Sequence, residues 1–96
     1  MSVIITLEAE IQTGKKESLL TMLKKYLPET KAYEGFIDIT INTQKGSNHV
    51  LFYEKWETVE AYEAYLSWRT ETGVMDELSA IFKDRPSIRY YETEDL

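Results

Sequence analysis

Few residues in this sequence have side chains that could carry a reaction. Its one histidine, His49, stands where an expected strand begins, and a polar structural role is the more frequent one at such a position. Glu54 and Trp56 follow on one face of that strand, where Glu54 suits an ordinary cross-strand charge pair. The pair Glu8 and Glu10 favours solvated or interface charges over an acid–base dyad. These residues by themselves indicate no reaction.

An aromatic stripe is the second candidate. Tyr62, Tyr65 and Trp68 are spaced three residues apart in a segment with helical periodicity. Such stripes most often belong to a hydrophobic core or an interface between subunits. The alternative is the wall of a pocket between helix and sheet, where ring faces stack on a flat ligand and phenol groups orient it. Both interpretations stay open on spacing alone.

Composition excludes several classes of function. The absence of cysteine rules out disulfides, thiolate nucleophiles and cysteine-built metal clusters, and a single histidine rules out chemistry that needs two imidazoles from one chain. Eleven basic against seventeen acidic residues give a net charge of −6, which argues against nucleic acid and anionic membranes as partners. We therefore expect no metal and no cofactor.

The first residues lack the basic segment and long apolar run of a signal peptide, and no stretch approaches the ~20 apolar residues of a membrane span. We expect a cytoplasmic protein that forms one domain over residues 1–96.

Hydrophobic periodicity predicts seven structural elements. In chain order they are a strand over 3–11, a helix over 15–33, strands over 36–42 and 49–56, two helices separated near Gly73, and a strand over 88–92. Pro28 is predicted to kink or break the first helix near Leu27. Thr58 is a suitable N-cap for the second helix. Ile37, with the isoleucines at 39 and 41, is predicted to share one face of its strand.

This order is the split βαβ pattern of α+β ferredoxin-like folds, with the helices on one face of a four-stranded antiparallel sheet. The other sheet face would be bare. Yet strand 49–56 is apolar on both sides, with Val50 and Phe52 on one and Leu51 and Tyr53 on the other. Because a strand that is apolar on both sides needs cover on both, we expect a homodimer that packs through its sheet faces.

The sequence also resembles a known family. The segments that carry the resemblance are Val3-Ile4-Ile5-Thr6-Leu7, Gly14-Lys15 before a leucine-rich helix, Glu34-Gly35-Phe36, Phe52-Tyr53-Glu54-Lys55-Trp56-Glu57-Thr58 and Ala61-Tyr62-Glu63-Ala64-Tyr65-Leu66. They resemble the antibiotic biosynthesis monooxygenase family, whose Glu-x-Trp strand and following helix match the last two segments. The resemblance covers nearly the whole chain.

The resemblance implies a dimeric α+β barrel with a pocket between each sheet and its own helices. Activities in the family include oxygenation of quinols and polyketide aromatics without metal or flavin, haem degradation, and isomerisation of a small signalling molecule. In the cofactor-free members, the electron-rich ring of the substrate passes an electron to oxygen. The protein then supplies placement, desolvation and hydrogen bonds to the developing anion.

The sequence departs from the family at informative positions. Quinol-type members carry His-Leu-x-x-Pro-His where this chain reads Tyr65-Leu66-Ser67-Trp68-Arg69-Thr70, so both histidines and the proline are missing. The positions that match the haem-binding residues of haem-degrading members hold Leu7, Tyr65 and Met75, which disfavours haem oxygenation.

The resemblance therefore implies a cofactor-independent monooxygenase that acts on a small aromatic or quinol-like molecule. Tyr65 and Trp56 are the predicted catalytic residues, and the predicted substrate-binding residues are Leu7, Leu23, Tyr62, Trp68 and Met75. A non-catalytic dimeric domain that binds a small ligand or is associated with stress, and an isomerase that uses the same pocket, are the alternatives. On this interpretation Tyr65→Phe would change stability by only about 1 kcal/mol or less.

Overall fold

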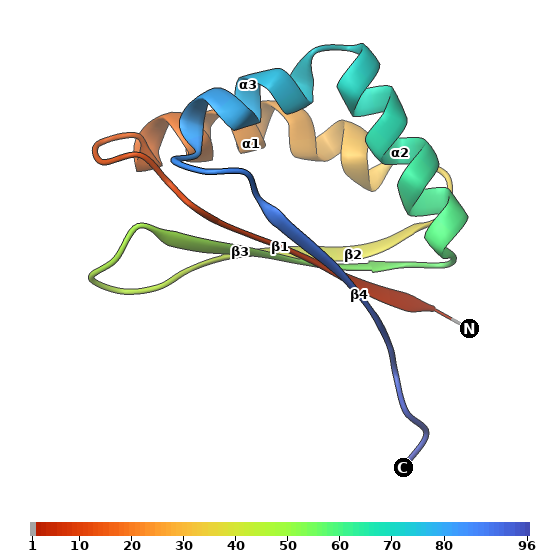
Figure 1. Ribbon diagram of the computed structural model, residues 1–96. Helices are drawn as coiled ribbons and strands as arrows, with labels where there is room; N and C mark the ends of the chain where they lie inside the picture. The colour runs from red at the N-terminus through yellow and green to blue at the C-terminus, as the bar shows by residue number, and fades with distance from the viewer. Residues whose placement is uncertain (1) are drawn as a thin grey trace.

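Four strands and three helices make up the computed structural model, which describes residues 2–96. In chain order they are β1 (Val3–Glu10), α1 (Lys16–Lys31), β2 (Phe36–Thr43), β3 (His49–Trp56), α2 (Val59–Glu71), α3 (Val74–Ile81) and β4 (Ser87–Glu92). The strands form one antiparallel sheet in the order β2-β3-β1-β4, and all three helices cover the same face of it (Figure 1). The predicted α+β ferredoxin-like fold is confirmed.

The two central strands, β1 and β3, supply most of the sheet's contribution to the core. They pair over their whole length, with Val3 opposite Trp56 and Leu7 opposite Phe52. All four of these side chains are almost completely buried. Glu54 shares the helix-facing side of β3 with Phe52 and Trp56, so the alternation of the strand carries a carboxyl group into the core.

Ile37 does not share a face with the other two isoleucines of β2. The pairing register between β2 and β3 shifts between Phe36 and Asp38, which places one extra residue in β2. Ile37 is that residue, and it is 44% exposed, whereas Ile39 and Ile41 remain half-buried on the helix side. The strict alternation predicted for this strand is therefore wrong at Ile37.

The first helix is not broken at Pro28, because α1 continues to Lys31. Pro28 lies in its last turns, where the missing N–H removes one hydrogen bond, and the Pro28 carbonyl still accepts from the N–H of Ala32. The predicted start of α2 is confirmed, since the side chain of Thr58 accepts a 3.0 Å hydrogen bond from the N–H of Ala61. Gly73 separates α2 from α3 with φ of 85°, in the left-handed region that favours glycine.

The core consists of two hydrophobic clusters that lie side by side under the helices. The larger cluster includes Leu7, Leu23, Phe52 and Leu78, and the smaller one is built around Trp56 with Tyr62, Val3 and Ile5. The seam between these clusters is where the polar residues Thr30, Glu54 and Arg69 are buried. A functional site between sheet and helices would lie along this seam.

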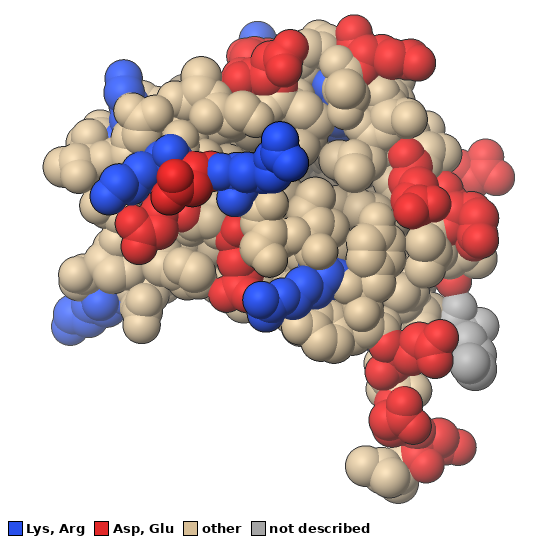
Figure 2. Space-filling model, in the orientation of Figure 1, with Lys and Arg blue, Asp and Glu red and all other residues tan. Residues whose placement is uncertain are grey.

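Charge is distributed unevenly over the surface. In the view of Figure 2, acidic side chains gather on the segment that follows β4 and extends away from the domain. Within residues 2–96, no helix combines the length and the apolar character that crossing a membrane requires.

Candidate functional site

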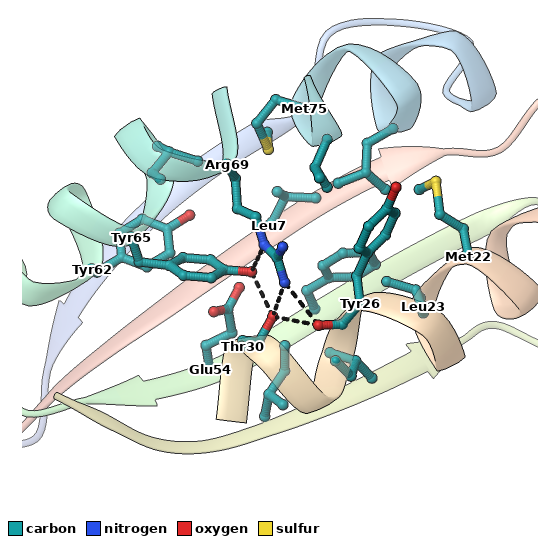
Figure 3. A pocket seen from close by; sticks show the side chains of 16 residues that line it. Leu7, Met22, Leu23, Tyr26, Thr30, Glu54, Tyr62, Tyr65, Arg69 and Met75 are labelled. Carbon is teal, nitrogen blue, oxygen red and sulfur yellow. Dashed lines mark hydrogen bonds between the residues drawn. The ribbon is translucent and has the colours of Figure 1, made fainter. Parts of the chain in front are cut away.

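A cavity of about 40 Å³ lies at the seam between the two hydrophobic clusters (Figure 3). The three helices bound it on one side and the sheet on the other. Its walls are mostly apolar and include a few polar side chains. The lining residues are Leu7, Met22, Leu23, Tyr26, Leu27, Thr30, Ile39, Phe52, Glu54, Tyr62, Tyr65, Leu66, Arg69, Val74, Met75 and Leu78.

Five of the seven residues predicted for the site line this cavity, although they come from four different elements. They are Leu7 on β1, Leu23 on α1, Tyr62 and Tyr65 on α2, and Met75 on α3. The structure therefore brings together residues that are distant in the sequence. The other two predicted residues, Trp56 and Trp68, do not line the cavity.

Trp56 lies directly behind the wall. Its ring centroid is 5.0 Å from that of Tyr65 and 5.7 Å from that of Tyr62, so it supports both phenols from below. Its indole Nε1 donates a 3.0 Å hydrogen bond to Oε1 of Glu54. The position of Trp56 thus suits support of the cavity wall and of Glu54 more than contact with a ligand.

Trp68, on α2, lies next to the cavity wall and is not part of it. Its ring stacks on Tyr33 with 5.4 Å between centroids, and the guanidinium carbon of Arg69 lies 4.5 Å from its ring centroid. Trp68 therefore contacts two residues of the cavity wall: Arg69, as a cation–π neighbour, and Tyr65, whose ring centroid is 6.2 Å from its own.

Glu54 is the first functional candidate that the sequence analysis missed. Its side chain is buried, and Trp56 supplies its only hydrogen bond among the described residues. Burial raises the pKa of Glu54 to about 7, and the hydrogen bond from Trp56 lowers it only in part. A carboxyl group with this pKa can both give and take a proton near neutral pH, which suits a general acid or base.

Arg69 is the second candidate that was missed, and it connects α2 to α1. Although only 2% exposed, it makes four hydrogen bonds. Nη2 donates to the carbonyl of Tyr26 at 2.7 Å and to Oγ1 of Thr30 at 3.0 Å. Nη1 donates to the largely exposed carboxylate of Glu29 at 3.2 Å. The cavity wall therefore holds a permanent positive charge.

Tyr65 is held in this network through its hydroxyl group. Nε of Arg69 donates to the Tyr65 oxygen at 3.0 Å, and the same oxygen lies 2.6 Å from Oγ1 of Thr30 (Figure 3). Because a guanidinium group only donates, the phenol proton of Tyr65 remains free for Thr30 or for a ligand in the cavity. Tyr65 is thus positioned as a hydrogen-bond donor backed by a cation.

Tyr26 separates the cavity from a groove on the outer surface. It lines both spaces, as does Met22, and the outer groove also includes Glu77. The hydroxyl of Tyr26 donates a 2.7 Å hydrogen bond to Oε2 of Glu77 on α3, and this bond raises the pKa of Tyr26. Tyr26 therefore forms part of the wall between the cavity and the outer groove.

His49 lies away from the cavity, at the start of β3. Its Nε2 is 2.9 Å from Oε1 of Glu8, on the neighbouring strand β1. It therefore makes a polar contact at a strand end, the role that its position in the sequence favours.

Comparisons with known proteins agree with this architecture. The family model described as antibiotic biosynthesis monooxygenase matches residues 2–70. No curated protein matches the sequence at a significant level.

Solved structures share the fold over the whole chain. A conserved protein from Methanosarcina mazei Go1 has a TM-score of 0.88 at 15% identity, with 98% of this chain and 94% of that chain covered. A structure described as an antibiotic biosynthesis monooxygenase has a TM-score of 0.85 at 11% identity, with 97% and 99% covered. A protein from Mycobacterium tuberculosis has a TM-score of 0.74 at 13% identity, with 100% and 98% covered. Since the family model spans most of the sequence, the chain belongs to the antibiotic biosynthesis monooxygenase family.

Proposed function

We propose that this protein is a cofactor-independent monooxygenase that acts on a small aromatic or quinol-like molecule in the cavity between the sheet and the helices. The observation that carries the proposal is the pairing of Glu54, a buried carboxyl group with a pKa of about 7, with an apolar cavity that it lines. Membership in the family supports the reaction class.

The reaction begins with a proton transfer from a phenolic hydroxyl of the substrate to the ionised Glu54. Oε2 of Glu54 is the candidate acceptor, because Oε1 already accepts from Trp56. The resulting phenolate is electron-rich enough to pass one electron to dioxygen, and the two radicals then combine. For a hydroquinone, the overall balance is quinol plus O₂ giving hydroxyquinone plus water.

The remaining wall residues fit the other needs of this reaction. The hydroxyl of Tyr65, backed by the guanidinium of Arg69, can donate a hydrogen bond to negative charge that develops on the bound molecule. The apolar side chains exclude water, which strengthens that interaction. Arg69 acts here as a positioning residue, since four of its five N–H donors bind protein groups.

One observation favours the non-catalytic alternative. The cavity of about 40 Å³ is much smaller than the roughly 150 Å³ that holds a benzene molecule in an engineered protein cavity, so an aromatic substrate requires the wall to move. The unbranched side chains of Met22 and Met75, with Tyr26 beside them, are suited to such rearrangement. A domain that only binds a smaller ligand would not need this movement of the wall.

Oxygen consumption tests the proposal. The purified protein, with a metal chelator present, is mixed with a panel of hydroquinones and anthrones in an oxygen electrode. We expect uptake well above the rate of autoxidation for at least one compound. Uptake that never exceeds autoxidation, together with saturable binding of the same compounds, would favour the binding domain instead.

Tyr65→Phe is expected to lower kcat/KM by about 100- to 1000-fold, the usual effect of removing one donor to a developing oxyanion. Because Arg69 and Thr30 both contact the lost hydroxyl, the structure also raises the expected stability cost above the value inferred from sequence, to about 1.5–3 kcal/mol. Tyr33→Phe is the matched control, since Tyr33 packs against Tyr65 but lies outside the cavity wall. Equal activities of the two variants would remove Tyr65 from the site.

We further propose that the protein forms a homodimer through the outer faces of its sheets. This face has no helix over it (Figure 1), and it presents Tyr53 and Tyr91, each 46% exposed. Between them lies Thr6, which pairs with Tyr53 across the strands and has a buried hydroxyl without a hydrogen-bond partner among the described residues. A second copy would cover the two exposed tyrosines, whereas the Thr6 hydroxyl is already shielded from solvent within one chain.

A double variant, Tyr53→Glu with Tyr91→Glu, is expected to shift the protein to monomers at micromolar concentration. An obligate dimer needs about 2,000 Å² of mainly apolar contact, and the two substitutions would place charges within that contact. Light scattering reads out the mass, and Ser67→Glu on the exposed side of α2 is the control. A wild-type protein that scatters as a monomer would contradict the dimer.

A further inference from the structure

The two ends of the cavity differ in chemistry. At one end the wall consists of Leu7, Leu23, Phe52 and Leu78, all members of the larger hydrophobic cluster, with Met75 packed against it. Of the polar residues of the wall, Glu54, Tyr65 and Thr30 lie on the side of Tyr62, whereas Tyr26 lies beside Leu23 (Figure 3). The apolar end therefore offers mainly hydrocarbon and thioether surface, and the hydroxyl of Tyr26 beside it already donates its proton to Glu77.

Size and polarity together select the kind of molecule that fits the apolar end. A buried water needs about two to four polar partners, whereas apolar cavities in proteins accept guests such as benzene or xenon. The whole cavity has a volume of about 40 Å³, which suits one molecule of roughly two or three heavy atoms and is much smaller than the roughly 150 Å³ that holds a benzene molecule. A small apolar molecule would enter this space without losing hydrogen bonds and without displacing the wall.

We propose that the apolar end of the cavity, bounded by Leu7, Leu23, Phe52, Met75 and Leu78, is a preformed binding site for dioxygen. Its role as the co-substrate site rests on the proposed oxygenase function, but the binding of a small apolar gas does not. Glu54 and Tyr65 line the same cavity, so dioxygen in this site would lie next to an aromatic anion that these two residues hold once the wall has moved to admit it. The arrangement keeps the electron acceptor close to its donor and away from bulk water.

Xenon is the probe for this site, because it is apolar, inert and independent of catalysis. Methyl NMR spectra of the wild-type protein are recorded under increasing xenon pressure, and then in solutions equilibrated with nitrogen or with oxygen. We expect saturable xenon-induced shifts at the methyl groups of Leu7, Leu23, Met75 and Leu78. Dissolved oxygen, which is paramagnetic, is expected to increase the relaxation of the methyl groups of Leu7, Leu23 and Leu78 more than that of Val50, which is likewise buried but lies outside the wall.

Two phenylalanine substitutions on α3 provide the matched comparison. Met75→Phe fills the apolar end and is expected to abolish the xenon shifts at Leu7 and Leu23. Ile81→Phe adds a similar ring to the same core cluster outside the cavity wall and is expected to leave these shifts unchanged. If Met75→Phe fails to fold, Leu23→Phe fills the space from α1 instead.

The gas site is overturned if xenon produces no saturable shifts at these methyl groups, or if Met75→Phe and Ile81→Phe reduce the shifts equally. The oxygen-electrode assay is separate from this test. Xenon and oxygen effects at the cavity without oxygen uptake for any substrate would sink the oxygenase function while leaving the gas site in place.

Discussion

Replacing Arg69 by methionine is expected to lower the free energy of unfolding by about 3–5 kcal/mol. The guanidinium group donates to Tyr65, to Thr30 and to the carbonyl of Tyr26, and each hydrogen bond to a charged group contributes about 1.5–3 kcal/mol without strict additivity. Methionine keeps most of the apolar contact but leaves these three acceptors without their donor. Urea denaturation followed by tryptophan fluorescence measures the change.

Glu29→Gln is the control for this experiment, because it removes the negative charge of the only ion pair that Arg69 makes within residues 2–96. The Glu29 side chain is 56% exposed, so this variant should stay within about 1 kcal/mol of wild type. If Arg69→Met were as mild as Glu29→Gln, Arg69 would be replaceable by apolar packing, as some buried ion pairs are. Its role as the support of Tyr65 would then fail.

Glu54→Gln is expected to lower kcat/KM by about 10²- to 10⁴-fold, the range for loss of a positioned general base. Glutamine keeps the shape of the side chain and can still accept the hydrogen bond from Trp56, but it cannot take a proton. Rates measured from pH 5 to 8 should rise for the wild type as Glu54 ionises with its pKa of about 7. This rise should be absent from the residual activity of the variant.

The same residue predicts how stability depends on pH. Burial raises the pKa of Glu54 from 4.5 to about 7, so the folded state binds the proton more tightly than the unfolded state does. Tighter proton binding by Glu54 in the folded state therefore contributes to the free energy of unfolding. This contribution is complete, at roughly 3 kcal/mol, below about pH 4.5 and is lost as the pH rises through 7. Glu54→Gln should remove this part of the pH dependence.

Denaturation midpoints of the wild type, Glu54→Gln and the exposed neighbour variant Glu57→Gln, compared across this range, test the assignment. We expect Glu57→Gln to follow the wild type. A wild-type stability that rises steadily between pH 4.5 and 7, or a Glu54→Gln profile parallel to it, would show that Glu54 is ionised in the folded protein throughout.

The order of strands and helices could be predicted because the changes of hydrophobic period along the sequence are clear. That order, the split βαβ pattern, places the helices on one face of the sheet. The sequence did not predict the bulge at Ile37, since a one-residue shift depends on how β2 pairs with β3 and leaves no mark in the local pattern. Nor did it predict that α1 passes through Pro28, because a proline near a helix end removes only one hydrogen bond.

The candidate site was predicted in its aromatic part and missed in its charged part. The residue type of Glu54 favours an ordinary cross-strand charge pair, although its alternation with Phe52 and Trp56 places it on the buried face of the strand. Arg69 and Thr30 carry no such signal: they meet only because α1 and α2 pack together over the seam between the two hydrophobic clusters. The size of the cavity likewise depends on packing.

The central claim is that the cavity catalyses transfer of one oxygen atom from dioxygen to an aromatic molecule without a cofactor. Its most direct test is mass spectrometry of the product formed under oxygen-18 gas, using the hydroquinone or anthrone that gives the fastest uptake, with chelator present. The account predicts one labelled oxygen atom in the product, with the second recovered as labelled water, at a rate that falls sharply in Glu54→Gln. An unlabelled product accompanied by stoichiometric hydrogen peroxide, or labelling that is equally fast with Glu54→Gln, would contradict it.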